Sequence, residues 1–546
     1  MGKRIVIDPI TRIEGHLKIE VEVANGKVKN AWSSGQMFRG IELMLEGRDP
    51  RDAQHFTQRS CGVCTYIHAL CSVRAVEDAL GIQIPENARI IRNLLNGAQT
   101  QHDHIVHFYH LHALDWVDIV SALSADPAKT AKLSGNLSGR PNNAAHFKAV
   151  QDKLKGFVGS GQLGPFNNAY WGHSAYKLPA EANLMATSHY LDALKLQIKA
   201  ARMHAIFGGK NPHPQSLVVG GVTSVKDLNV KRIQEFEDIW KETKAFVDEV
   251  YIPDLLAVAS FYKDWGAIGG NKNFLAYGEF PLDDHENKLL MPRGFIRNGK
   301  LTPETVNAAR ITEDVTSAWY EQSSAKHPYN GETKPIKADP TYDTNSQYTW
   351  MKAPRYDGLS SEVGPLSRVL VAYASGDKAT QNIVNSTLKK LNVPADALFS
   401  TLGRTAARGL ETVLIGDSMG SWLDQLKTNI SRGNKNTYQK WDWPTREVRG
   451  YGLNDIPRGA LGHWIIIKDK KIKKYQYVVP STWNLCGRDV KGQLSPVENA
   501  LIGTPIADPK KPVEILRTVH SFDPCIACAV HVIDPHTNET YKVKVL

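Results

Sequence analysis

Cysteine is scarce in this 546-residue chain, which contains only six. So few thiols exclude a scaffold that is held together by disulfides. Long apolar runs are also missing, since no segment reaches the ~18 residues of a membrane-spanning helix. The first residues, "MGKRIVIDPITR", lack the hydrophobic stretch of a signal peptide and the Ser or Thr that N-myristoylation needs at position 6. We therefore expect a globular protein with no membrane span and no export signal of its own.

Internal repeats and low-complexity segments are absent from the sequence as well. The net charge of +10 is spread along the chain, and the one short basic run, "KDKKIKK" at 468–474, is typical of a solvated hairpin tip. A basic balance can favour an acidic partner or an anionic membrane surface. We give the net charge little weight as an indication of a partner, and we expect no nucleic-acid partner.

Hydrophobic periodicity predicts an α+β fold that is predominantly α-helical. Apolar residues alternate with polar ones over 17–23, and Asn25-Gly26 then indicates a hairpin. A helix is predicted after residue 64, with Gly81 at its end. Long helical patterns, typical of a bundle, cover about 86–123, 181–207, 230–264, 365–391 and 404–430. Residues 265–365 indicate irregular structure with short strands, and 463–480 a hairpin, so small sheets should flank the bundle.

Four of the six cysteines form two CxxC pairs at opposite ends of the chain. Cys61 and Cys64 lie in "RSCGVCTYIH" (59–68), and Cys525 and Cys528 lie in "DPCIACAVH" (523–531). Four thiolates suit zinc, an Fe–S cluster, or nickel with iron. A structural zinc site fits the spacing alone. Such sites are usually local, whereas these pairs need the whole fold to meet, which favours a buried reactive centre in a single domain.

The residues beside the pairs also indicate chemistry. His68 lies one helical turn after Cys64 and could donate a hydrogen bond to a cysteine sulfur, although a satisfied core histidine is the simpler interpretation. Arg59 and Asp523 place a charge two residues before each pair. Cys71 and Cys486, the two remaining cysteines, are expected to be small buried residues.

With these motifs in view, the sequence resembles the large subunit of [NiFe] hydrogenases, specifically the group 1 membrane-bound uptake type. The resemblance extends over essentially the whole chain and includes "RIEGH" (12–16), "FRGIE" (38–42), "HDHIVHFYHL" (102–111), "LGRTAARGLET" (402–412), "PRGALGHW" (457–464) and "VVPSTWN" (478–484). It implies the large-subunit fold, with residues 1–531 as one catalytic domain. Two positions depart from the family pattern, Cys71 and Cys486-Gly487, and neither is an implied ligand.

The resemblance implies a Ni–Fe centre that splits H2 into two protons and two electrons. Cys61 and Cys525 would be terminal nickel ligands, and Cys64 and Cys528 would bridge nickel and iron. The iron would also carry one CO and two cyanides. A second ion, Mg²⁺, would be held by Glu42, the backbone carbonyl of Tyr477 and His531.

Further residues receive roles from the same resemblance. Glu14 would relay protons beside Cys525, and Arg458 would stand over the open metal site, held by Asp103 and Asp523. Pro457 and Ser481 would line the pocket of the diatomic ligands. Val63 and Leu111 would narrow a gas channel, although from the sequence alone both are core residues.

Partners and processing are implied too. The two spare cysteines cannot hold Fe–S clusters, so a small subunit must carry the clusters and also the export signal to the periplasmic side of the membrane. A membrane cytochrome b is a further expected partner. Residues 532–546 would be a C-terminal extension that a maturation endopeptidase removes after His531.

Three alternatives stay open at this point. A regulatory H2 sensor shares the site but generally lacks the extension. A quinone-reductase relative of respiratory complex I shares the fold but has lost the four cysteines. A zinc-stabilised structural protein would contain zinc alone, whereas a hydrogenase would contain about one nickel and one iron.

Overall fold

The computed structural model describes residues 3–161, 163–166, 169–224 and 228–526. Its N-terminal part is an antiparallel sheet of β1 (Lys3–Ile7), β2 (Leu17–Ala24) and β3 (Lys27–Gly35). Asn25 and Gly26 both have positive φ values in the turn that pairs Ala24 with Lys27. The predicted hairpin is therefore confirmed, because this turn type needs residues that tolerate a left-handed backbone.

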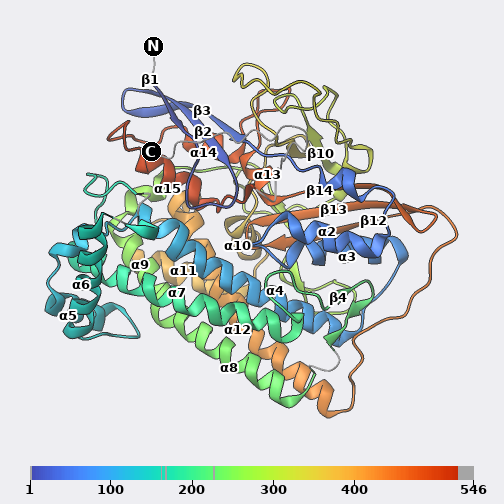
Figure 1. Ribbon diagram of the computed structural model, residues 1–546, viewed down its shortest axis with the longest axis horizontal. Helices are drawn as coiled ribbons and strands as arrows, with labels where there is room; N and C mark the ends of the chain where they lie inside the picture. Colours follow the sequence, from blue (N-terminus) through green and yellow to red (C-terminus); the bar gives the residue numbers. More distant parts are fainter. Residues whose placement is uncertain (1–2, 162, 167–168, 225–227, 527–546) are drawn as a thin grey trace.

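Long helices form the main body of the molecule. The four that pack side by side are α4 (Glu86–Val106), α7 (Ala180–Gly208), α8 (Val230–Phe246) and α12 (Thr401–Ser431) (Figure 1). Where α4 meets α12, a Cβ added at Gly97 would lie 2.9 Å from the sulfur of Met419, so the two helices pack closely there. The predicted bundle is confirmed.

Three of the predicted long helices are interrupted. The helix expected over 86–123 ends at Val106 and continues as a π-helical turn, His107–His112. A second π-helical turn, Val247–Tyr251, separates α8 from α9 (Ile252–Phe261). The pattern over 365–391 divides into α10 (Pro365–Ala374) and α11 (Lys378–Leu391), where Asp377 caps the second helix. A π turn adds one residue without removing the apolar face, so periodicity does not reveal it.

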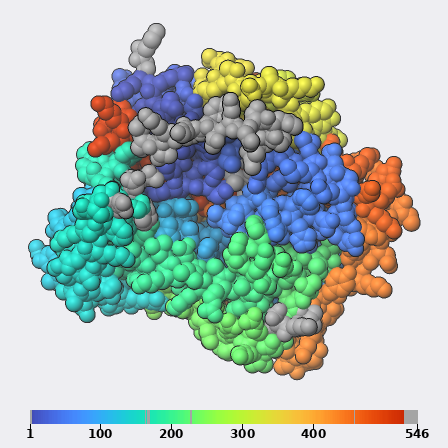
Figure 2. All heavy atoms as spheres, viewed as in Figure 1, coloured from blue at the N-terminus to red at the C-terminus, as the bar shows by residue number. Residues whose placement is uncertain are grey.

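Two helices of more than ten residues were not predicted from the sequence. They are α5 (Pro127–Leu137), capped by Asp126, and α6 (Ala144–Ser160), capped by Asn143. Both have many exposed positions, which weakens their apolar pattern. They form the left edge of the molecule as drawn (Figures 1 and 2).

The C-terminal half contributes a second three-stranded antiparallel sheet. It consists of β12 (Val448–Ile456), β13 (Gly459–Lys468) and β14 (Lys471–Val478), so the predicted hairpin is confirmed and a third strand is added. The sheet lies on α3 (Ile67–Leu80), the helix that follows the first CxxC pair. A Cβ at Gly450 would lie 2.3 Å from the backbone nitrogen of Ala79, so only glycine allows this contact.

Residues 265–365 are irregular with short strands, as predicted. The strand pairs are β6 (Phe274–Ala276) with β9 (Gly294–Ile296), β7 (Glu279–Pro281) with β8 (Leu289–Met291), and β10 (Ile311–Asp314) with β11 (Ala353–Tyr356). Shorter elements elsewhere are α1 (Ile41–Leu45), α2 (Ala53–Thr57), α13 (Pro480–Leu485), α14 (Pro496–Leu501), α15 (Val513–Ser521), β4 (Leu217–Val218) and β5 (Gly221–Val222). Within the described ranges, no helix is both long and apolar enough to cross a membrane.

The two ends of the described chain meet. Glu14 and Cys525 form a parallel β-bridge, and the backbone N–H of Ile526 donates to the carbonyl of Glu14 at 2.7 Å. In Figure 1, α14 and α15 accordingly lie beside the N-terminal sheet. The fold thus brings the second CxxC segment to the first.

Candidate metal centre

Three cysteine sulfurs converge in the core. The Sγ atoms of Cys61, Cys64 and Cys525 lie within 4.8 Å of one another, and all three residues are buried. The sulfurs of Cys61 and Cys525 are 3.2 Å apart and are not joined by a disulfide. Soft donors gathered in this way suit a thiophilic metal such as nickel, so the residues fit the implied centre. Cys528 lies outside the described residues.

The loop before α3 prepares Cys61 for a negative charge. The backbone N–H groups of Val63 and Cys64 point at its sulfur, at 3.2 and 3.4 Å. Such donors stabilise a thiolate. Arg39 fixes the loop, because its Nη2 donates to the carbonyls of Arg59 and Ser60 at 2.8 and 2.7 Å. The side chain of Arg59 itself is exposed.

Glu14 and Ser481 both contact Cys525. The carboxyl oxygen Oε2 of Glu14 lies 3.4 Å from the Cys525 sulfur. The hydroxyl oxygen of Ser481 accepts the backbone N–H of Cys525 at 3.0 Å. Glu14 therefore stands where it could exchange a proton with the sulfur. Ser481, expected to line the pocket of the diatomic ligands, holds the backbone of Cys525.

Arg458 is held between two buried carboxylates. Its Nη1 is 3.0 Å from Asp103 Oδ2 and its Nη2 is 3.2 Å from Asp523 Oδ1. Burial alone would lower the pKa of Arg458, but the charges of Asp523 and Asp103 raise it well above the ordinary value. The guanidinium therefore stays cationic at any working pH. Asp103 and Asp523 thus lie where they can hold the arginine, and its place over the open metal site stays a prediction.

Pro457 connects this arginine to a network that the sequence did not reveal. Its carbonyl accepts Nη2 of Arg368 at 3.1 Å, and Arg368 also pairs with both carboxylate oxygens of Glu411 at 2.7 and 2.8 Å. Burial acts to raise the pKa of Glu411, yet Arg368 and His104 lower it to about 2. The only sign of this network in the sequence was the presence of charged residues in "LGRTAARGLET". The structure shows that this whole segment is buried, its charged residues included.

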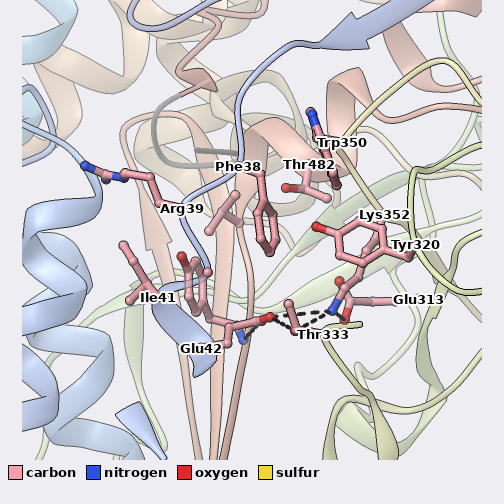
Figure 3. Close-up of a pocket in the computed structure, with 13 residues that line it drawn as sticks. Phe38, Arg39, Ile41, Glu42, Glu313, Tyr320, Thr333, Trp350, Lys352 and Thr482 are labelled. Carbon is pink, nitrogen blue, oxygen red and sulfur yellow. Dashed lines mark hydrogen bonds and ion pairs between the residues drawn. The ribbon is translucent and has the colours of Figure 1, made fainter. Parts of the chain in front are cut away.

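Glu42 lines a buried pocket of about 50 Å³. Figure 3 shows Glu42, Thr333, Lys352 and Glu313 pointing toward one another. The ammonium of Lys352 lies 3.6 Å from Glu42 and 3.7 Å from Glu313, and burial raises the pKa of Glu313 to about 7. Neither Lys352 nor Glu313 was predicted, since they lie in the segment with weak periodicity.

Tyr477 contacts Glu42 through its backbone N–H, which donates to Glu42 Oε1 at 3.0 Å. The expected role of its carbonyl as an ion ligand stays a prediction. Two carboxylates and a threonine hydroxyl are nonetheless oxygen donors of the kind that Mg²⁺ prefers, so the residues fit a hard cation. His531, the remaining implied ligand, lies outside the described residues.

His68 is fully buried at the start of α3. Its Nδ1 bonds to Nε2 of His463 at 3.2 Å, and its Nε2 makes no hydrogen bond to Cys61, Cys64 or Cys525. The expected bond to a sulfur is therefore not formed with any described cysteine. Burial lowers the pKa of His68 to about 4, so the imidazole is neutral at pH 7.

Four other predicted residues have ordinary surroundings. Val63 is partly buried against the core, and the carbonyl of Leu111 accepts Nη1 of Arg12 at 2.7 Å. Their role in gas access stays a prediction. Cys71 and Cys486 are fully buried, as expected of small core residues.

Comparisons with known proteins agree with this geometry. The nickel-dependent hydrogenase family matches residues 39–531, and a family described as HoxL-like matches residues 4–33. The uptake hydrogenase large subunit of Bradyrhizobium diazoefficiens is 50% identical, over 100% of this chain and 98% of that protein. The hydrogenase-1 large chain of Escherichia coli K12 is 46% identical, over 100% of this chain and 97% of that one.

Solved structures extend the comparison to the fold. The Ni-Fe-Se hydrogenase from D. vulgaris Hildenborough has a TM-score of 0.81 at 35% identity, covering 97% of this chain and 100% of that chain. The enzyme from Desulfomicrobium baculatum has a TM-score of 0.77 at 36% identity, with the same coverage. The predicted fold class is thereby confirmed. Family, relatives and fold together show that this chain belongs to the nickel-dependent hydrogenases, as a large subunit of the uptake type.

Proposed function

We propose that this protein is the catalytic subunit that oxidises H2 to two protons and two electrons at a four-cysteine Ni–Fe centre. The observation that carries the proposal is the convergence of Cys61, Cys64 and Cys525, three buried thiols from both ends of the chain. The 50% identity to an uptake hydrogenase supports the direction of catalysis. Cys528, two residues beyond the described part, is assigned as the fourth ligand.

In this assignment, four cysteines would hold the centre: Cys61 and Cys525 would be ligands of nickel, and Cys64 and Cys528 would be ligands of both metals. The bound centre, with one CO and two cyanides on iron, supplies the site for heterolytic cleavage of H2. Glu14 then takes up and releases the proton, since its Oε2 lies 3.4 Å from the Cys525 sulfur. A carboxyl placed this close to a thiol can act as a general acid and base.

Arg458 would contribute a fixed positive charge at the site. Asp103 and Asp523 orient the guanidinium, while Pro457 and Ser481 line the pocket for the diatomic ligands. The expected action of His68 on a sulfur ligand has no support from a hydrogen bond to any described cysteine. A preorganised cation in a dry site stabilises developing negative charge more strongly than water would.

A hydrated Mg²⁺ is proposed in the pocket of Glu42, with Tyr477 and His531. The oxygen-rich lining and the buried carboxylate pair of Glu42 and Glu313 support it. Lys352 would then balance the charge of the carboxylates beside the ion.

Electrons must leave through a partner. Cys71 bonds to the carbonyl of Gly452, and Cys486 lies beside Arg355, so these spare thiols belong to separate surroundings and hold no cluster. We therefore assign an Fe–S small subunit as partner, with export together to the periplasmic side of the membrane and a membrane cytochrome b as a further partner. Removal of residues 532–546 by a maturation endopeptidase is part of the same proposal, supported by the family match that ends at residue 531.

Metal analysis and infrared spectroscopy of the purified complex test the proposal. We expect about one nickel and one iron per chain, CO and cyanide stretching bands, and H2-dependent dye reduction. Cys61→Ser should remove nickel and activity, whereas Cys71→Ser, a change at an equally buried thiol, should retain both. Zinc as the only metal would refute the proposal.

A further inference from the structure

Asp115 is the centre of a buried cluster that joins the two ends of the chain. One of its carboxylate oxygens, Oδ1, accepts Nη2 of Arg12. The other, Oδ2, lies 2.6 Å from Nδ1 of His520 and 3.1 Å from Nδ1 of His112. The side chains of Asp115, His112 and His520 are at most 1% exposed and that of Arg12 is 7% exposed, so water competes little for these bonds.

The cluster connects three segments of the fold. Asp115 ends the 3₁₀ turn that follows the π turn of α4, and His520 lies in the last turn of α15. Arg12 lies in the loop between β1 and β2, which also contains Glu14. His520 contacts the same loop directly, because its Nε2 lies 2.8 Å from the carbonyl oxygen of Thr11.

The bonds of His112 determine where its proton is. Its Nε2 lies 3.0 Å from the indole Nε1 of Trp116, and an indole nitrogen can only donate. Nε2 therefore accepts, and the single proton of the neutral ring is on Nδ1, where it faces Asp115. Burial lowers the pKa of His112 to about 4, which agrees with a neutral ring at pH 7.

His520 has to donate from both of its ring nitrogens. Its Nε2 faces a backbone carbonyl and its Nδ1 faces the Asp115 carboxylate. Burial acts to raise the pKa of Asp115, but Arg12 and His520 lower it well below the ordinary value, so this group is ionised and only accepts. A neutral imidazole would turn a lone pair toward one of the two oxygens. His520 is therefore an imidazolium, a charge that the C-terminal end of a helix also favours.

A metal ion is a less suitable occupant of this cluster. His112, Asp115 and His520 offer ligand atoms within 4.8 Å of one another. However, the nitrogen of each histidine that faces Asp115 carries a hydrogen and has no lone pair for a metal. The guanidinium of Arg12 already pairs with the carboxylate and would repel a further cation. The cluster is therefore better explained as a connection between segments of the chain.

The loop that the cluster holds is the one that positions Glu14. Arg12 has a φ of 56°, a left-handed backbone that residues with a side chain rarely adopt, so the loop needs bonds that maintain it. Glu14 follows two residues later and forms the β-bridge to Cys525. Its Oε2 lies 3.4 Å from the Cys525 sulfur, a distance that a displaced loop would change.

We propose that His520, as an imidazolium bound to Asp115, is a positioning residue that holds the Thr11 carbonyl and thereby keeps Glu14 beside the Cys525 sulfur. This inference rests on the proposed function, because it needs Glu14 as the proton carrier. His520 itself touches neither the sulfur nor the carboxyl group in any bond described here. It acts through the backbone of the loop.

His520→Phe tests the inference, because it keeps a ring of similar size and removes both donors. We expect turnover of the complex to fall by about 10²-fold, the effect of misplacing a reacting group by about 1 Å. Nickel content and the CO and cyanide bands should stay the same. His204→Phe is the matched control, since His204 is also buried and its Nε2 bonds to the carbonyl of Leu95 at 2.9 Å. Equal turnover of the two variants would overturn the inference.

The double variant Glu14→Gln/His520→Phe separates positioning from a general loss of stability. If His520 acts through Glu14, the double variant should be no slower than Glu14→Gln alone, because two residues that act as a unit do not lose activity independently. If the two losses multiply instead, His520 does not act through Glu14 and the inference fails.

Neutron diffraction from wild-type crystals of the complex, exchanged into D2O at pH 7, is a further test that does not depend on a variant folding. We expect deuterons on both ring nitrogens of His520 and on Nδ1 alone of His112. A single deuteron on His520 would overturn the inference. If the wild-type complex shows no CO or cyanide bands, the proposed function fails instead, so the two failures are distinguishable.

Discussion

At the scale of single residues, the site depends on buried charged side chains that are paired with charges of the opposite sign. Arg458 reaches Asp103 and Asp523 with separate nitrogens, at 3.0 and 3.2 Å. A lysine has a single ammonium and cannot reproduce a planar fork between two carboxylates. The geometry of the arginine, as well as its charge, is therefore expected to matter.

Arg458→Lys tests this expectation. We predict that the rate of H2 oxidation falls by about 10²–10³-fold, the usual effect of losing one preorganised donor. Metal content should stay the same. Arg92→Lys is the control, because Arg92 is equally buried and makes a two-bond pair with Glu77 at 2.7 and 2.9 Å. Equal activities of the two variants in a dye-reduction assay would contradict the assigned role.

Glu14→Gln isolates the proton step. The amide keeps the size of the side chain but cannot exchange a proton, so turnover should fall by about 10²-fold or more. The infrared bands should not change, since the metal ligands are intact. Glu20→Gln, a change at a buried carboxylate on β2 of the N-terminal sheet, should leave turnover unaffected. A Glu14→Gln enzyme with wild-type turnover would exclude Glu14 as the proton carrier.

Asp455 predicts a pH dependence of stability. Burial raises its pKa to about 6, although Arg368 opposes the rise, and the ordinary value is 3.8. Between about pH 4 and 6, the folded protein retains a proton that the unfolded chain has released, so this residue makes stability fall as pH rises. Thermal unfolding of wild type and Asp455→Asn should show a steeper decline for wild type in this window. Parallel curves would contradict the prediction.

At the scale of elements, the packing of α3 against β12 determines where the first CxxC pair lies. Gly450 approaches the helix so closely that a Cβ would lie 2.3 Å from Ala79 N and 2.4 Å from Ala75 O. Both atoms belong to the backbone and cannot rotate away. Displacing this strand would also move His463, which follows it in the same sheet and bonds to His68.

Gly450→Ala is therefore expected to destabilise the protein by about 1–3 kcal/mol, the usual cost of overpacking. Gly156→Ala on α6 is the control, because nothing lies within 4 Å of the added Cβ. There the helix should gain about 0.5–1 kcal/mol from the loss of a glycine. Denaturant unfolding of both variants measures the difference, and a neutral Gly450→Ala would show that β12 can move.

The sequence predicts these elements unevenly, for physical reasons. The β2–β3 hairpin and α3 were predictable because Asn25, Gly26 and Gly81 mark their turns by local backbone chemistry. The end of α4 at Val106 was not, because a π turn preserves the apolar face. Strand β12 was also not predicted. Its glycines, Gly450 and Gly452, weaken the strand pattern, and the reason for them is a contact with α3, which is distant in the sequence.

At the scale of the whole molecule, the site exists only because the two ends of the chain meet. The bridge between Glu14 and Cys525 joins residues that are 511 positions apart. The ligand cysteines could be predicted from their spacing and from the family resemblance. Lys352, Glu313 and His520 could not, because an ion pair or hydrogen bond between distant segments leaves no local pattern.

The central claim is that cysteines from both ends of this chain hold nickel and iron together. Anomalous diffraction from crystals of the complex, at energies on either side of the nickel and iron absorption edges, tests it most directly. The account predicts two adjacent peaks, one nickel and one iron, among the sulfurs of Cys61, Cys64, Cys525 and Cys528. A single zinc peak there, or peaks remote from Cys61 and Cys525, would contradict it.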